Sequence, residues 1–162
     1  MKIALASDHA GFELKSAILE HFERQGIDFR DFGCGPGETV DYVDYAARAA
    51  ESVVEGACGR AILFCGTGIG MAVAANKFRG IRATPCWNLY TASISRRHND
   101  SNCLALGGRV LTREEAVAIV EAWLEAPFEG GRHERRVGKI SALESVNFKN
   151  RNRRKRHVLT ER

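Results

Sequence analysis

The stretch that decides the fold is Ala61-Ile62-Leu63-Phe64-Cys65-Gly66-Thr67-Gly68-Ile69-Gly70-Met71-Ala72-Val73-Ala74-Ala75-Asn76-Lys77. Its first four residues are apolar, as expected for a strand buried on both faces of a parallel sheet. A thiol, Cys65, stands at the carboxyl end of this strand, and three glycines then allow a tight turn into a helical pattern. The amides of such a turn, with the free N–H groups of the following helix, form a cradle for an anion.

The thiol of Cys65 has two interpretations. Beside a helix N-terminus its thiolate is favoured, because the positive end of the helix dipole stabilises negative charge. The alternative is a buried structural cysteine that precedes a glycine turn. The three glycines lead us to favour a chemical role.

Two common glycine motifs do not fit this turn. If the dinucleotide fingerprint begins at Gly66, its third glycine position holds Met71, and a start at Gly68 fails in the same way. No Asp or Glu lies between Glu55 and Asp100 to hold a ribose hydroxyl, and no Gly-Lys-Ser/Thr follows the turn. The cradle is therefore expected to face a small anion or an oxyanion rather than a nucleotide.

Length and composition indicate one globular domain. The 162 residues suffice to bury a sizeable core, and the 44% hydrophobic and 27% charged residues are ordinary values for a soluble protein. No apolar run reaches the roughly 18 residues of a membrane span, and the first residues are predicted to form a strand rather than a signal peptide. We therefore expect a cytoplasmic protein with no membrane partner.

Cysteine usage agrees with this location. The five cysteines are odd in number and form no Cys-x-x-Cys pair, which indicates reduced thiols in a reducing compartment. Neither the cysteines nor the five histidines show the spacing of zinc ligands, so no metal site is predicted.

Charge is distributed unevenly along the chain. The net charge is +4, but residues 145–162 hold seven basic residues and one acid, which leaves the first 144 residues with a charge of −2. We expect a domain over residues 1–144, followed by a basic C-terminal extension over residues 145–162. We interpret the extension as a solvated, partly helical segment; the alternatives are binding to nucleic acid or an acidic partner, and packing on a dimer neighbour. Its basic residues are Lys149, Arg151, Arg153, Arg154, Lys155, Arg156 and Arg162.

Strand and helix patterns alternate along the chain, which indicates an α/β fold with a five-stranded parallel sheet and helices on both faces. The expected strands are residues 2–6, 27–32, 61–65, 81–84 and 103–106, and Pro85 is expected to open a loop. Helices are expected between the first strand and Gly26, over 41–55, after the glycine turn, over 88–97, from a capping box at Thr112, and from 130 onward.

Ligands of such sheets bind at the carboxyl ends of the strands. This rule places three polar groups on one edge of the predicted sheet: Asp8 with His9, residues 65–70, and residues 98–100. Each has a structural alternative, since Asp8 is also suited to capping the first helix, and His98 to a polar turn that ends a helix.

Three arginines are candidates for binding phosphate. Arg132 and Arg136 lie four residues apart at the start of the last predicted helix and therefore share a face. With Arg109, which follows the fifth strand, they would supply guanidinium groups to a phosphate. The alternative is a solvated helix face on which these arginines pair with Glu134 or Glu129.

Several short blocks of the sequence, in this order, resemble one known family. They are Ser-Asp-His-Ala-Gly at 7–11, Asp-Tyr at 41–42, Cys-Gly-Thr-Gly-Ile-Gly at 65–70, Asn-Lys-Phe-Arg-Gly-Ile-Arg-Ala at 76–83, Arg-His-Asn-Asp at 97–100, Gly-Gly-Arg at 107–109 and Gly-Gly-Arg-His-Glu-Arg-Arg at 130–136. Together they resemble ribose-5-phosphate isomerase of the B type, the family that also contains the allose- and galactose-6-phosphate isomerases. The resemblance covers residues 1 to about 144.

The resemblance implies a Rossmann-like α/β/α sandwich that interconverts an aldose phosphate and a ketose phosphate without metal or cofactor. It further implies that Cys65 is the base that moves a proton between C1 and C2, and that His98 helps to open the sugar ring. The developing oxyanion would be held by Gly66, Thr67, Gly68, Ile69 and Gly70.

For the remainder of the substrate, the resemblance implies that Asn99, Asp8 and Tyr42 contact the sugar. The implied phosphate cage consists of His9, Arg109, Arg132 and Arg136, with His133 as a further candidate. In this family the site is built between two subunits, so a homodimer at least is implied.

We therefore expect an isomerase of ribose 5-phosphate and ribulose 5-phosphate. An isomerase of a six-carbon sugar phosphate, such as allose 6-phosphate, is the alternative within the same class, because pocket depth is not encoded in these motifs. A non-catalytic nucleic-acid-binding module that uses residues 145–162 is the alternative from another class, and we disfavour it because runs of charge are usually solvated.

Overall fold

The computed structural model describes the backbone of residues 1–159 and the side chains of residues 1–148. Five parallel strands form one sheet, in the order β2-β1-β3-β5-β4. They are β1 (Ile3–Ser7), β2 (Phe29–Asp31), β3 (Arg60–Cys65), β4 (Ala83–Pro85) and β5 (Cys103–Gly107). The predicted five-stranded parallel sheet is therefore confirmed, and β3, the apolar run that ends at Cys65, lies at its centre.

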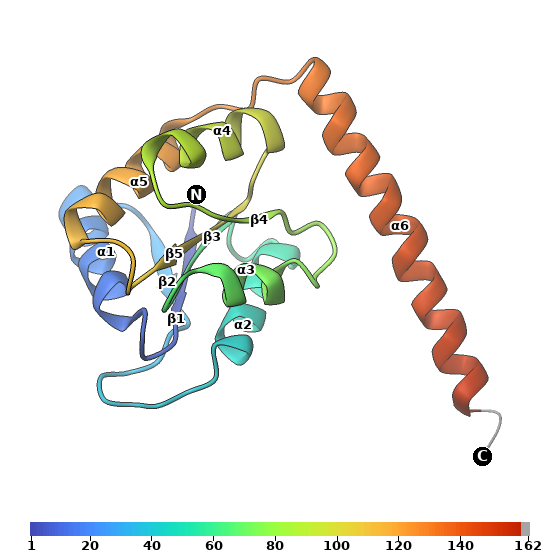
Figure 1. Ribbon diagram of the computed structural model, residues 1–162, viewed down its shortest axis with the longest axis horizontal. Coiled ribbons are helices and arrows are strands. Elements are labelled where there is room, and N and C mark those ends of the chain that lie inside the picture. The colour runs from blue at the N-terminus through green and yellow to red at the C-terminus, as the bar shows by residue number, and fades with distance from the viewer. Residues whose placement is uncertain (160–162) are drawn as a thin grey trace.

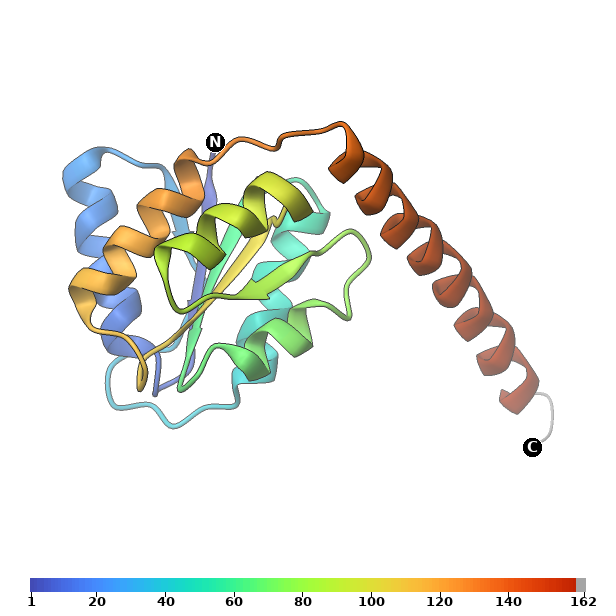
Figure 2. The same ribbon diagram turned by 45° about the horizontal axis from the view of Figure 1, so that its top comes forward.

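Helices cover both faces of the sheet, as predicted (Figures 1 and 2). One face carries α1 (Phe12–Gln25), α4 (Leu89–Asn99) and α5 (Arg113–Glu125), and the other carries α2 (Tyr42–Val54) and α3 (Ile69–Ala75). The last helix, α6 (Arg132–Leu159), leaves this sandwich and projects away from it (Figure 1).

The core has two layers because neighbouring residues of a strand point to opposite faces. Ile62 and Phe64 of β3 are fully buried in the layer beneath α1 and α5, whereas Leu63 lies in the layer beneath α2 and α3. Three buried alanines of α2, at 46, 49 and 50, allow this helix to lie close to the sheet. Burial on both faces explains why β3 reads as a continuous apolar run.

Two helix ends follow the predicted signals. Gly26 ends α1 in the left-handed region, at a φ of 66°. The capping box at Thr112 is formed in full: its hydroxyl accepts a hydrogen bond from the backbone of Glu115, and the Glu115 carboxylate accepts one in return.

The edge strands differ from their predicted bounds. The strand predicted over 27–32 is formed only by Phe29–Asp31, and Pro85, expected to open a loop, is instead the last residue of β4. Proline is tolerated there because β4 is an edge strand, so the missing N–H breaks no ladder between two neighbours.

The helix α6 runs through the predicted boundary between residues 144 and 145 without interruption. That boundary stays a prediction, and the side chains of the basic residues, from Lys149 onward, lie outside the described residues. Glu144 accepts a hydrogen bond from the Gly80 amide at 2.8 Å, and Ser145 accepts one from Arg79 at 3.1 Å, which connects α6 to the segment before β4. Within residues 1–159 no helix is both long and apolar enough to cross a membrane.

Candidate active site

The strands β1 and β3 lie side by side, and the chain leaves them toward opposite sides of the sheet. Such a switch point opens a crevice at the carboxyl ends of the strands. Asp8 follows β1 and is nearly buried; its amide donates to the Phe64 carbonyl at 3.1 Å, and its carboxylate accepts from the Gly11 amide at 2.9 Å. This carboxylate therefore fixes the turn before α1 and does not cap the helix with its side chain.

The predicted cradle is formed directly after β3. Gly68 has a φ of 81°, and this left-handed conformation turns its amide back toward Cys65, donating to the sulfur at 3.2 Å. The Ile69 amide donates to the Thr67 hydroxyl at 3.3 Å. The Cys65 residue is 5% exposed, so a little of it reaches the surface beside this amide.

Glycines let neighbouring groups approach the cradle closely. A Cβ atom at Gly70 would lie 2.8 Å from the ring of Tyr42, and one at Gly66 would lie 3.4 Å from the side chain of Arg109. The structure therefore places Tyr42 and Arg109 against the cradle at the carboxyl edge.

Two further contacts complete this edge. His9 is exposed, and its Nδ1 accepts from the Val40 amide at 3.5 Å, so the loop between β2 and α2 crosses beside it. The indole N–H of Trp87 donates to the Thr67 carbonyl at 3.2 Å. Trp87 was not among the predicted site residues, because nothing in its local sequence indicates a contact with a turn 20 positions earlier.

The prediction that residues 98–100 share this edge is wrong. The helix α4 begins at the carboxyl edge, where Asn88 caps it, and runs back across the sheet. Its end lies at the amino edge, since Asn102 accepts from the Ala61 amide at the start of β3. The length of β3, about 20 Å for its six residues, thus separates His98 from Cys65 within one chain.

The remaining predicted residues divide between the two edges. His9 and Arg109 lie at the carboxyl edge, whereas Arg132 and His133 begin α6 beside His98. Arg136 is one turn further along α6, and Asn99 follows His98 at the end of α4. One chain therefore holds the predicted site as two separate halves. The thiol of Cys65 lies in the half at the carboxyl edge, and His98 lies with the arginines of α6 in the half at the amino edge.

The amino-edge half is a compact cluster. The rings of His98 and His133 are stacked, with centroids 4.0 Å apart and planes inclined by 10°. Glu129 lies beside both rings, with its Oε2 atom 3.5 Å from Nε2 of His98 and 3.8 Å from Nε2 of His133. Arg97 donates to Oε1 of Glu129 at 2.7 Å, and Arg132 donates to Nε2 of His133 at 3.1 Å.

The charges in this cluster follow from these contacts. The hydrogen bond from Arg97 lowers the pKa of Glu129, so its carboxylate is ionised at neutral pH. Burial lowers the pKa of His133, and the nearby His98 and Arg132 act in the same direction. His133 is therefore neutral at neutral pH, in agreement with its acceptance of a hydrogen bond from Arg132.

A metal ion does not fit this cluster as it stands. The ligand atoms of His98, Glu129 and His133 lie within 4.8 Å of one another. An imidazole lone pair lies in the plane of its ring, however, and two stacked, nearly parallel rings have no nearby point in both planes. The residues are arranged for hydrogen bonding rather than for coordination of one ion.

A thiol, an amide cradle and basic side chains at a switch point define the class: an α/β protein whose site suits proton transfer on a small anionic molecule. Residues 3–140 match the family described as Ribose/Galactose Isomerase. The chain is 49% identical over 143 residues to ribose-5-phosphate isomerase B of Escherichia coli, covering 88% of this chain and 96% of that one. The chain belongs to the Ribose/Galactose Isomerase family.

Solved structures agree with this assignment. Ribose-5-phosphate isomerase B of Clostridium thermocellum superposes with a TM-score of 0.89 at 49% identity, covering 91% of this chain and 99% of that chain. The enzyme of Mycoplasma genitalium, determined with bound ribulose 5-phosphate, superposes with a TM-score of 0.82 at 39% identity, covering 89% and 96%. The resemblance and the Rossmann-like sandwich predicted from the sequence are both confirmed.

Proposed function

We propose that this chain interconverts ribose 5-phosphate and ribulose 5-phosphate, with Cys65 as the base. The observation that carries the proposal is the thiol at the end of β3, which accepts a hydrogen bond from the Gly68 amide within the glycine turn. The high identity to ribose-5-phosphate isomerases B over nearly their whole length supports the same substrate.

The reaction begins with the closed sugar ring. His98 takes the proton from the hydroxyl on C1; the C1–O4 bond breaks as the C1 carbonyl forms, and O4 takes the proton back from His98. The Cys65 thiolate then removes the proton on C2, and the electron pair moves to the C1 oxygen, which gives an enediolate. A proton passes from O2 to O1, the thiol returns its proton to C1, and the ketone forms at C2.

The cradle acts on the intermediate. Amides fixed before the reaction stabilise the oxyanion at no cost of reorganisation, and one such donor contributes about 3–4 kcal/mol. The candidate donors are the amides of residues 66–70, beside the Thr67 hydroxyl. Asp8, Tyr42 and Asn99 are proposed to bind sugar hydroxyls, and His9, Arg109, Arg132, His133 and Arg136 to bind the phosphate, whose distant binding energy orients C2 toward the sulfur.

We further propose that the working site is formed between two copies of the chain. Cys65 and His98 lie at opposite edges of one sheet, so neither reaches a substrate held by the other in the same chain. In a two-fold dimer the carboxyl edge of each copy meets the amino-edge cluster of its partner, and two equivalent sites result.

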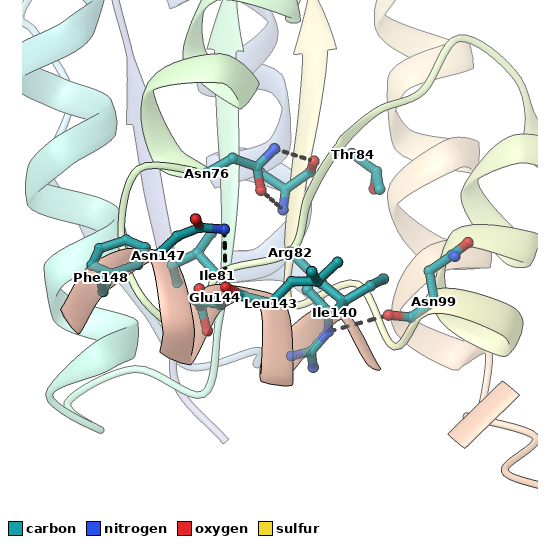
Figure 3. A pocket seen from close by; sticks show the side chains of 11 residues that line it. Asn76, Ile81, Arg82, Thr84, Asn99, Ile140, Leu143, Glu144, Asn147 and Phe148 are labelled. Atoms are coloured by element: carbon teal, nitrogen blue, oxygen red, sulfur yellow. Dashed lines mark hydrogen bonds between the residues drawn. The ribbon is translucent and has the colours of Figure 1, made fainter. Parts of the chain in front are cut away.

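A groove beside Asn99 fits this arrangement. A hollow of about 480 Å³ lies between α6 and the segment around β4, and Ile140 and Leu143 of α6 face it (Figure 3). These two side chains are 48% and 65% exposed. Toward the carboxyl edge, the side chains of Tyr42 and Val43 at the start of α2, and of Ile69 and Val73 on α3, are likewise exposed. We propose that these apolar side chains of the second copy pack in the groove.

A complementation experiment tests the dimeric site. Cys65→Ala and His98→Asn are each expected to lose turnover, and heterodimers purified through two different tags contain one intact site and one doubly altered site. Their expected activity is about half that of the wild-type dimer. Heterodimers as inactive as the two parents would place both halves of a site in one chain. Cys65→Ala is also expected to retain binding of ribose 5-phosphate.

Substrate choice is tested by a coupled assay with ribose 5-phosphate and allose 6-phosphate. Preference for ribose 5-phosphate is expected, and turnover of neither sugar would defeat the proposal.

Deletion of residues 145–162 should leave most activity intact. If the chain were instead a nucleic-acid-binding module, this deletion would abolish a steeply salt-dependent affinity for nucleic acid.

We also propose the cytoplasm as the compartment. All five cysteines are free, and all are buried, as expected for a chain that folds where thiols stay reduced. Burial raises the pKa of Cys103 and of Cys86, which makes these two thiols poor nucleophiles.

A further inference from the structure

The loop between α5 and α6 places Glu129 at the end of α4. Its amide donates to the Arg97 carbonyl at 3.0 Å, and its carboxylate accepts a hydrogen bond from the guanidinium of Arg97. Gly130 and Gly131 follow with φ values of 66° and 56°, so two successive left-handed residues turn the chain into α6 immediately after the carboxylate. Glu129 is therefore held by both its backbone and its side chain.

Only one of the two stacked rings is available to donate to Glu129. Arg132 donates to Nε2 of His133, which makes that nitrogen an acceptor and puts the proton of the neutral ring on Nδ1. Nε2 of His98 faces Oε2 of Glu129 at 3.5 Å, and a carboxylate can only accept. This separation is longer than that of an ordinary hydrogen bond.

We propose that Glu129 is a positioning residue for His98: it holds the proton of the neutral ring on Nε2 and so leaves the lone pair on Nδ1 for the sugar. This inference rests on the proposed function, in which His98 opens the ring. In residues 1–148 no side chain or amide forms a hydrogen bond with Nδ1 of His98, so this nitrogen remains available to the substrate.

The carboxylate also assists the proton transfer. When Nδ1 takes the proton of the C1 hydroxyl, the ring becomes positively charged, and the ionised Glu129 beside it stabilises that charge. The proton then moves from Nδ1 to O4, so the ring is regenerated and Glu129 keeps its charge throughout.

The substitution Glu129→Gln gives a sharp test. Arg97 binds an oxygen, so the amide oxygen of glutamine is expected to take the place of Oε1, and its NH₂ group then faces Nε2 of His98. A donor at this place forces the opposite tautomer, with the proton on Nδ1. Nitrogen-15 NMR of the ring distinguishes the two forms. The wild type is expected to show the Nε2–H form of His98, and Glu129→Gln the Nδ1–H form.

Kinetics supply the second readout. By analogy with carboxylates that orient metal-bound histidines, Glu129→Gln is expected to lower kcat for ribose 5-phosphate about 10- to 100-fold with little change in KM. The analogue 4-deoxyribose 5-phosphate lacks the hydroxyl that closes the ring, so its turnover relative to wild type should fall much less. Arg97→Met, which removes the clamp on the carboxylate, should lower kcat in the same direction.

The matched control is Glu121→Gln. Glu121 of α5 lies 3.2 Å from Nε2 of His21, so the same exchange is made beside a histidine outside the site. It should leave turnover of ribose 5-phosphate unchanged. The inference would be overturned if Glu129→Gln kept the wild-type tautomer of His98 or the wild-type kcat, provided that His98→Asn is impaired in the same assay. Absence of turnover in the wild type would instead overturn the proposed function itself.

Discussion

Gly68 is the position at which the fold and the proposed chemistry depend on one missing side chain. Its φ of 81° is left-handed, and alanine in this conformation is strained by about 1–2 kcal/mol. A Cβ atom there would also lie 3.0 Å from the backbone carbon and oxygen of Ala105, which cannot move without disturbing β5. Such overpacking adds about 1–3 kcal/mol, so Gly68→Ala is expected to lower the free energy of unfolding by about 2–5 kcal/mol.

The chain contains a control for the second contribution. Gly56 has a φ of 77°, but a Cβ atom there would meet nothing within 4 Å. Gly56→Ala should therefore show the backbone strain alone, about 1–2 kcal/mol. Urea unfolding at a fixed protein concentration measures both variants, and the difference between their free energies of unfolding isolates the approach to Ala105.

Activity should separate the two variants further. The Gly68 amide donates to the Cys65 sulfur, and displacement of a donor of this kind lowers kcat by about 10²- to 10³-fold. Gly56→Ala should turn over like the wild type. If Gly68→Ala is no less stable than Gly56→Ala and retains full kcat, then neither the close approach to β5 nor the placement of this amide matters as argued.

Two further predictions concern charge. Burial lowers the pKa of His133 from 6.5, so below pH 6.5 the unfolded chain binds a proton that the folded chain does not, and the free energy of unfolding falls as pH falls. The urea midpoint of the wild type should therefore drop between pH 7.5 and 5.5. It should drop less in His133→Asn. Asp100→Ala removes the carboxylate that lies 2.8 Å from the buried guanidinium of Arg96 and should cost about 3–5 kcal/mol, measured by urea unfolding. Asp100→Asn should cost less, because asparagine retains an acceptor and tolerates the φ of 47°; equal losses would contradict this account.

The sequence predicted the structural features that depend on a pattern of neighbouring residues. The apolar run of β3, the glycines after it and the capping box at Thr112 each act within a few residues, and the structure has them as expected. The switch point between β1 and β3 was not predicted, because the alternation of strands and helices does not by itself fix the order of the strands in the sheet.

The amino-edge half of the site was misplaced for a geometric reason. Residues 98–100 follow a strand in the sequence, but a helix of 11 residues lies between, and such a helix spans about 16 Å. That length returns the chain to the opposite edge of the sheet, so helix length, rather than order along the chain, decides where His98 lies.

Other contacts lie beyond any local pattern. The hydrogen bond from Trp87 to Thr67 joins residues 20 positions apart, and Glu129 lies 31 positions from His98. The sequence indicates Glu129 only as a surface partner for arginine. The Gly130-Gly131 pair that follows it indicated a helix start, but which side chain the turn presents depends on how α6 leaves the sandwich.

The helix α4 has a consequence for the proposed dimer. At one end, the segment before its cap holds the Thr67 carbonyl through Trp87, and at the other end the helix carries His98. In the proposed dimer, this one helix would therefore contribute to both active sites. A change that tilts it, even one that touches no substrate, would disturb the oxyanion pocket of one centre and the ring-opening group of the other together.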